Sequence, residues 1–184
     1  MKTFNYFFLF ISILFFSSFS ISDSDIIDGN NLNQEKLEAL ILKEVNAVRR
    51  KKRKPILILD SILNLAATDH AVYLKSAKKL SHNQKSKSKK TPMKRTDFYG
   101  GKFRFVGENI AYSYLQKDVN SAKRGGKVVY MSTYSKTAKH LFNLWYNSKP
   151  HFKNIMEKGF KKTSIRFSYD KKTNRIYAVQ VFAS

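Results

Sequence analysis

Residues 145–155 read WYNSKPHFKNI, and two shorter stretches earlier in the chain belong with them: SH at residues 81–82 and GENIA at residues 107–111. The three stretches supply two imidazole side chains and one carboxylate from separate parts of the sequence. The imidazoles are those of His82 and His151, and the carboxylate is that of Glu108. Titratable side chains that only the fold can bring together are the usual starting point for a candidate site.

The order of these stretches and the residues around them resemble the CAP superfamily, the cysteine-rich secretory, antigen 5 and pathogenesis-related 1 domain, in its bacterial SCP-like form. Further pieces of the resemblance are Asn46-x-x-Arg49, Ala67-x-x-His70-Ala71 and the ending YAVQVFA at residues 177–183. The resemblance covers roughly residues 35–182. A single piece such as GEN has little specificity, but the pieces together occur in the family's order. The resemblance implies an α+β fold, a three-layer α-β-α sandwich with an antiparallel central sheet.

The first 20 residues have the features of a secretory signal peptide. Lys2 precedes an apolar stretch at residues 7–16, and serine-rich residues follow it. The apolar stretch is shorter than the roughly 20 residues that cross a bilayer as a helix; an uncleaved N-terminal anchor is the alternative. We expect a signal peptide at 1–20, a flexible leader at 21–34 and one CAP-like domain at 35–184, in a protein that is secreted or held in the periplasm or cell envelope.

The sequence contains no cysteine. This excludes disulfide bonds, a thiolate nucleophile, a cysteine-linked lipid anchor and a cysteine-type zinc site. Eukaryotic members of the family that the chain resembles usually carry disulfides, so their absence favours a bacterial-type member. The stability of the domain must then come from its core.

The net charge is +22, and the positive charge is concentrated in the domain. Basic clusters lie at residues 49–54 and 85–95. A field of this sign attracts polyanions such as anionic lipid, acidic polysaccharide or nucleic acid. The alternative is a solvated surface of a lysine-rich protein. We expect no specific nucleic-acid recognition, because the clusters lack interleaved aromatic residues and a nucleic-acid-binding motif.

The hydrophobic pattern predicts helices in the first part of the domain and strands at its end. The polar composition of residues 83–105 and 116–127 predicts mobile loops. We expect the loops at 83–105 and 113–133 to frame a cleft. Residues 163–169 and 175–182 alternate between apolar and polar side chains, as antiparallel strands do. The expected helices are one from residue 35 into the basic cluster, one at 61–79 capped by Asp60, one at 137–146 capped by Ser135, and a short one near Pro150.

His82, Glu108 and His151 are candidate ligands for Zn²⁺ or another divalent cation, because neutral imidazoles and a carboxylate suit such an ion. The resemblance implies a His-Glu-Glu-His tetrad in a surface cleft, and these three residues match three of its positions. Ser148 stands near the fourth position and is a poor ligand, and Asn109 can complete the cleft by hydrogen bonding. The alternative is structural: the three side chains bond to each other or to the backbone. The same three residues are the candidates for any catalytic role.

Other conspicuous residues are expected to be structural. We expect His70 and Trp145, which lie on apolar helix faces, to be in the core. We expect His140 to be partly exposed and Arg49 to form a structural ion pair or hydrogen bond. No Gly-x-Ser-x-Gly motif for nucleophilic hydrolysis is present. We therefore expect an exported binding module for an anionic envelope, lipid or polymer ligand. The alternatives are a metal-dependent or serine-type hydrolase that uses the same cleft, and a basic binder of polyanions or nucleic acid.

Overall fold

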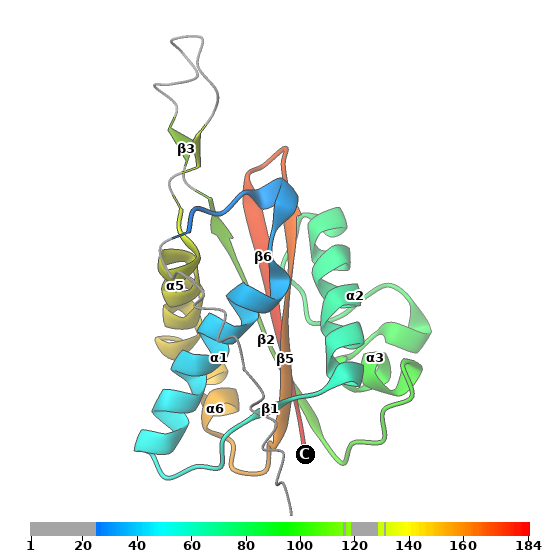
Figure 1. Ribbon diagram of the computed structural model, residues 1–184. Helices are drawn as coiled ribbons and strands as arrows, with labels where there is room; N and C mark the ends of the chain where they lie inside the picture. Colours follow the sequence, from blue (N-terminus) through cyan, green and yellow to red (C-terminus); the bar gives the residue numbers. More distant parts are fainter. Residues whose placement is uncertain (1–24, 116, 119–128, 131) are drawn as a thin grey trace, which may run out of the picture.

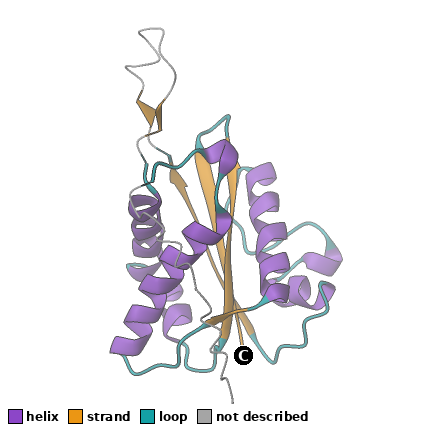
Figure 2. Cartoon of the chain, viewed as in Figure 1, coloured by secondary structure: helices purple, strands orange, loops and turns teal. Residues whose placement is uncertain are grey.

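The computed structural model describes residues 25–115, 117–118, 129–130 and 132–184. A four-stranded sheet lies between two layers of helices (Figures 1 and 2). The expected α-β-α sandwich is thereby confirmed. The predicted signal peptide at 1–20, the start of the leader and most of the predicted loop at 116–127 lie outside the described residues. One helical layer contains α1 (Gln34–Lys51), α5 (Tyr134–Tyr146) and α6 (Lys149–Met156), and the other contains α2 (Ser61–Ala77) and α3 (Pro92–Phe98).

The strand order in the sheet is β1-β5-β6-β2, so β1 and β2 form its two edges. The two strands expected at the C-terminus are confirmed as neighbours, joined by a turn in which Asn174 has a φ of 56°. β2, β6 and β5 are antiparallel, as expected, and the short β1 adds a parallel pairing to β5. The strands are β1 (Ile58–Leu59), β2 (Val106–Tyr114), β5 (Lys162–Asp170) and β6 (Arg175–Ala183); β3 (Lys117–Asp118) and β4 (Val129–Tyr130) form a separate pair.

Polar side chains fix where the helices begin. Asp60 caps α2 as predicted, because its carboxylate accepts hydrogen bonds from the backbone N–H groups of Ile62 and Leu63 at 3.0 and 3.1 Å. α5 begins earlier than predicted, at Tyr134, and its cap is Thr133 rather than Ser135. Each such cap satisfies a backbone donor that has no partner inside the helix.

The segment at 83–105 is more ordered than the sequence suggested. It contains the 3₁₀ turn η2 (Lys87–Lys89) and the helix α3, so the prediction of one long loop was wrong. Thr91 caps α3 and Pro92 occupies its first turn, where the missing N–H of proline costs nothing. α3 has only seven residues and packs against α2 and β2, so tertiary contacts and not its own periodicity stabilise it.

Two hydrophobic layers cover the faces of the sheet. On the α1, α5 and α6 face, Trp145 is fully buried, as predicted. On the α2 face, Tyr177 and Val179 of β6 pack with Leu63 and Leu74 of α2. None of the described helices combines the length and apolar character that a membrane crossing requires.

Arg49 is fully buried and ties three segments together, which bears out its expected structural role. Its guanidinium donates hydrogen bonds to backbone carbonyls of the turn after α1, of α6 and of the α6–β5 connection. The acceptors and distances are Pro55 at 2.6 Å, Ile155 at 2.7 Å, Phe160 at 2.9 Å and Glu157 at 3.0 Å. The end of α1 is therefore held rigidly against α6.

Candidate functional site

Glu108, in the edge strand β2, is the centre of a buried polar network. Only 1% of its side chain is exposed. The His82 Nδ1–H donates to Oε1 of Glu108 over 2.9 Å, so the structure brings together two of the predicted site residues. His82 follows α2 in a loop and its side chain is 50% exposed, so this ring connects the buried carboxylate with the solvent.

The second oxygen of Glu108 accepts a hydrogen bond from Arg95 of α3, a residue that the sequence analysis placed in a surface basic cluster. Arg95 is fully buried. It also donates to the carbonyls of His82 at 3.1 Å and Lys89 at 3.2 Å. A buried guanidinium therefore neutralises the carboxylate from inside the protein. No signal in the sequence separates Arg95 from the exposed lysines around it.

His70 of α2 also borders this network. As predicted, it is a core histidine whose ring nitrogens both have hydrogen-bond partners. Its Nε2–H donates to the carbonyl of Ser81 over 2.8 Å, and its Nδ1 accepts a hydrogen bond from Gln84 over 3.2 Å. Burial lowers the pKa of His70 from 6.5 to about 4, although the neighbouring Glu108 opposes the shift. The ring is therefore neutral at physiological pH, and it lies 3.5 Å from the Glu108 carboxylate.

Asn109 lies on the opposite face of β2 from Glu108, because successive side chains of a strand alternate. Its amide is fully buried against α6. It donates to the carbonyl of His151 over 3.2 Å and accepts from Asn154 over 2.9 Å. Asn154 also donates to the Glu108 carbonyl over 3.1 Å. Asn109 thus joins β2 to α6 through hydrogen bonds, one of which goes to the backbone of the candidate residue His151.

His151 stands in the first turn of α6 and is half-buried. Burial, followed by the nearby His82, lowers the pKa of His151 and favours its neutral form. Its Nδ1 atom is buried and has no hydrogen-bond partner among the described residues. Ser148 is the N-cap of α6, but its hydroxyl makes no capping hydrogen bond.

A metal site that uses the Glu108 carboxylate as a ligand does not fit these residues. Both oxygens of Glu108 already accept hydrogen bonds, one of them from a cation. Within the described ranges, no group of three His, Asp or Glu side chains is arranged to hold a metal ion. His82 and Glu108 therefore belong to one hydrogen-bonded network, and the buried Nδ1 of His151 has no partner in it among the described residues.

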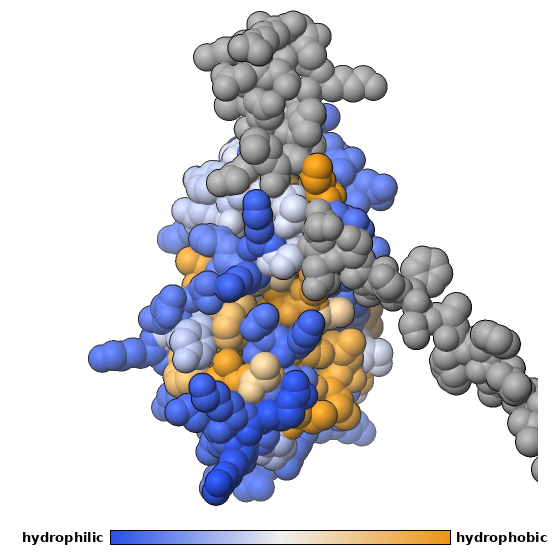
Figure 3. Space-filling view, turned by 60° about the vertical axis from the view of Figure 1, so that its left-hand side comes forward, coloured by the Kyte–Doolittle hydropathy of each residue, from blue (hydrophilic) through white to orange (hydrophobic). Residues whose placement is uncertain are grey.

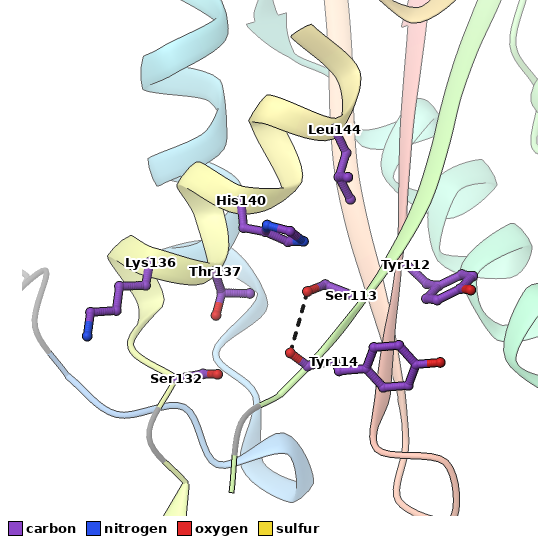
Figure 4. A pocket seen from close by; sticks show the side chains of 8 residues that line it. All are labelled: Tyr112, Ser113, Tyr114, Ser132, Lys136, Thr137, His140 and Leu144. Carbon is purple, nitrogen blue, oxygen red and sulfur yellow. Dashed lines mark hydrogen bonds between the residues drawn. The ribbon is translucent and has the colours of Figure 1, made fainter. Parts of the chain in front are cut away.

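A groove lies between α5 and the free edge of β2, away from the network. Its larger part has a volume of about 470 Å³, and an adjoining hollow of about 310 Å³ shares His140 and Leu144 with it and reaches Ser148. Figure 4 shows that His140 points from α5 toward β2, while Tyr112 and Tyr114 lie on the other side of the strand. His140 is exposed, as predicted. The residues that line the larger part are Tyr112, Ser113, Tyr114, Ser132, Lys136, Thr137, His140 and Leu144.

Both basic clusters lie at the surface, except that one arginine of each cluster is buried. Arg49 and Arg95 are fully buried and contribute nothing to surface recognition. Residues 50–53, just beyond Arg49, are exposed, as are most of the lysines at 85–90. Figure 3 shows hydrophilic side chains gathered at the lower end of the molecule, where α1 ends.

Comparisons with known proteins agree with this architecture. The sequence matches the family model of the cysteine-rich secretory protein family (CAP) over residues 42–182. No curated protein matched the chain.

The similar solved structures include an outer surface protein of Borrelia burgdorferi, at 19% identity and a TM-score of 0.61, with 88% of this chain and 98% of that chain covered. An extracellular protein of Bacillus anthracis that contains an SCP domain matches at 23% identity and a TM-score of 0.58; 82% of this chain and 41% of that chain are covered. A cysteine-rich secretory protein of Staphylococcus aureus matches at 12% identity and a TM-score of 0.54, with 82% and 39% covered. The chain thus spans less than half of two of these proteins.

Proposed function

Because the chain belongs to the cysteine-rich secretory protein (CAP) family, we propose that it is an exported module that binds an anionic ligand of a cell envelope, either a lipid or a polymer. The observation that carries the proposal is the distribution of charge. The buried acid Glu108 is neutralised internally, and partly buried acids such as Asp60 and Asp69 pair with lysines. Most Lys and Arg side chains in the described ranges are exposed to solvent, where they attract polyanions.

Export is supported from two directions. The N-terminal sequence has the features of a signal peptide. The similar structures include a protein named as extracellular and another named as an outer surface protein. A cell envelope supplies anionic partners for an exported protein, since its lipids and polymers carry phosphate or carboxylate groups.

Binding is favoured over catalysis because the His/Glu network has little spare reactivity. Glu108 has both oxygens engaged, and His70 is neutral and bonded at both ring nitrogens. The hydroxyl of Ser81, next to His82 in the chain, donates to the Asn83 carbonyl over 3.1 Å, so it is not paired with an imidazole as an activated serine nucleophile is.

The test is binding to vesicles that contain phosphatidylglycerol and to a soluble polyanion, over a range of salt concentrations. We expect binding at low salt that weakens steeply as salt rises, because exposed charges are screened. The double variant Lys51→Glu/Lys52→Glu should weaken it, whereas the matched control Lys171→Glu/Lys172→Glu, at the β5–β6 turn, should change it much less. Absence of binding to either probe at low salt would overturn the proposal.

One observation favours hydrolysis as a second candidate function. Glu108 orients the His82 ring through Nδ1, and the half-exposed ring has a second nitrogen, Nε2, with which to accept a proton. A panel of peptides and esters tests this candidate. Activity that is lost in His82→Gln and retained in the matched control His140→Gln would support a hydrolase; inactivity of the folded wild type would remove it.

A further inference from the structure

The connection between α1 and β1 combines exposed basic residues with exposed apolar ones. We define the α1–β1 corner as residues 50–59. Its first half, residues 50–54, consists of five consecutive Arg and Lys residues, four of them exposed. Its second half contains Ile56, Ile58 and Leu59, whose exposed fractions are 47%, 55% and 54%. Figure 3 shows apolar side chains beside the hydrophilic ones at this end of the molecule.

The backbone holds these apolar side chains outward. Leu57 is 2% exposed, and its N–H and C=O both bond to the amide of Asn46, at 2.8 and 3.0 Å. Side chains alternate along an extended segment, so a buried Leu57 requires that Ile56 and Ile58 point away from the core. Arg49 fixes the preceding carbonyl, that of Pro55, and Ile58 donates to the Lys161 carbonyl over 3.0 Å. The exposure of Ile56 and Ile58 is therefore a property of the rigid fold.

Exposure of the Ile56 and Ile58 side chains to water is energetically unfavourable. β1 is an edge strand, and edges that expose apolar residues tend to associate with other chains unless something covers them. Three kinds of partner would meet the corner differently. A soluble polyanion would pair with residues 50–54 but leave Ile56 and Ile58 in water. A second copy of the chain would cover the isoleucines but bring two sets of five positive charges together.

An anionic bilayer surface satisfies both halves of the corner. Its headgroups attract Lys and Arg, and the boundary between headgroups and acyl chains accepts apolar side chains. We propose that the α1–β1 corner is a membrane-docking surface, in which residues 50–54 bind anionic headgroups and Ile56 and Ile58 insert below them. This inference deepens the proposed function and rests on it. It commits the anionic ligand to lipid and sets the orientation of the bound protein.

The absence of cysteine makes the insertion directly measurable. The full-length variant Ile58→Cys has a single thiol, which takes an environment-sensitive fluorophore such as NBD. Leu65→Cys is the matched control, because Leu65 lies on α2 and is 50% exposed. We expect the probe at position 58 to shift to the blue with phosphatidylglycerol vesicles and not with phosphatidylcholine vesicles or dextran sulfate. The probe at position 65 should not shift in any of these conditions.

Other outcomes overturn the docking surface. Binding to anionic vesicles without a shift at position 58 would refute the inference while leaving the proposed function standing; attachment through the apolar segment at 7–16 alone gives this result. A shift at both positions, or one without vesicles as protein concentration rises, would show non-specific insertion or self-association instead. Failure to bind vesicles and dextran sulfate alike would refute the proposed function as well.

A second set of variants separates the two halves of the corner. Ile56→Ser/Ile58→Ser should weaken partitioning onto anionic vesicles about tenfold, since two half-exposed side chains lose their burial, and should leave dextran sulfate binding unchanged. Lys52→Glu should weaken binding to both the anionic vesicles and dextran sulfate. Loss of one positive charge near an anionic surface costs roughly fivefold in binding, and this variant costs more because it reverses the charge. Equal effects of the isoleucine variant on both probes would contradict insertion. Thermal melting of each variant checks that the fold is intact.

Discussion

Replacing Arg95 by methionine should destabilise the protein by about 4 kcal/mol. Arg95 is fully buried, and the Glu108 side chain with which it pairs is 1% exposed. Removing one partner of a buried ion pair costs about 3–5 kcal/mol, because the other charge stays in a site where water cannot solvate it. Arg95 also donates to the carbonyls of His82 and Lys89, and each such hydrogen bond contributes about 1 kcal/mol. Methionine preserves much of the volume, so the loss reports charge and hydrogen bonding rather than a cavity.

The assay is a double-mutant cycle in urea with Arg95→Met, Glu108→Gln and both together. Each single variant leaves a buried charge unpaired, whereas the double variant leaves none, so the double variant should lose at least 2 kcal/mol less than the sum of the singles. The control is Lys162→Met, which breaks an ion pair to Asp60 whose lysine is 41% exposed, and its cost should be about 1 kcal/mol or less. Additive losses, or an Arg95→Met variant as stable as the control, would refute the internal neutralisation of Glu108.

Three further predictions follow from the described contacts. Isothermal titration should find no micromolar zinc binding to the wild type, because the Glu108 oxygens are engaged and the described residues offer no group of three His, Asp or Glu ligands. Binding that disappears in His82→Ala and in His151→Ala would contradict this. The folded-state pKa of His70, about 4, lies below its unfolded value of 6.5, so stability should be constant above pH 6.5 and fall between pH 6.5 and 4 by up to about 3 kcal/mol; a His70→Asn variant that keeps this slope in pH-dependent urea unfolding would refute the assignment. Arg49→Lys should cost more than 2 kcal/mol in the same unfolding assay, since an ammonium cannot reach the four carbonyls that the guanidinium binds, and a near-neutral result would exclude that role.

The elements that the sequence predicted well are those with local signals. The last two strands follow from the alternation over residues 163–169 and the mostly apolar run at 175–182, and the structure extends each by one or two residues. Asp60 was identified as a cap because its side chain bonds only to its own neighbours in the chain. Such features depend on a few adjacent residues, so the order of residue types is sufficient to predict them.

The part of the site that was missed depends on contacts between distant segments. α3 has no apolar periodicity, so its sequence resembles the polar loop that was predicted there. The direction of Arg95 depends on how α3 packs against β2, and nothing in the run of lysines around it marks one guanidinium as buried. The opposite placement of Glu108 and Asn109 was accessible from sequence: in VGENIAYSY at 106–114, small residues and Asn109 alternate with Val106, Glu108 and larger side chains, the pattern of a strand.

The position of Glu108 explains how one polar side chain can be central to the fold. Its side chain joins α3 through Arg95 and the loop after α2 through His82, and its backbone carbonyl joins α6 through Asn154. One residue of an edge strand thereby fixes elements from both helical layers, in a chain that has no disulfide to do so. An internal guanidinium is better suited than a bound ion to this role, because it is part of the chain and neutralises the carboxylate regardless of the metal content of the surroundings. The exposed parts of the molecule, the groove beside α5 and the α1–β1 corner, are then free to determine what the protein binds.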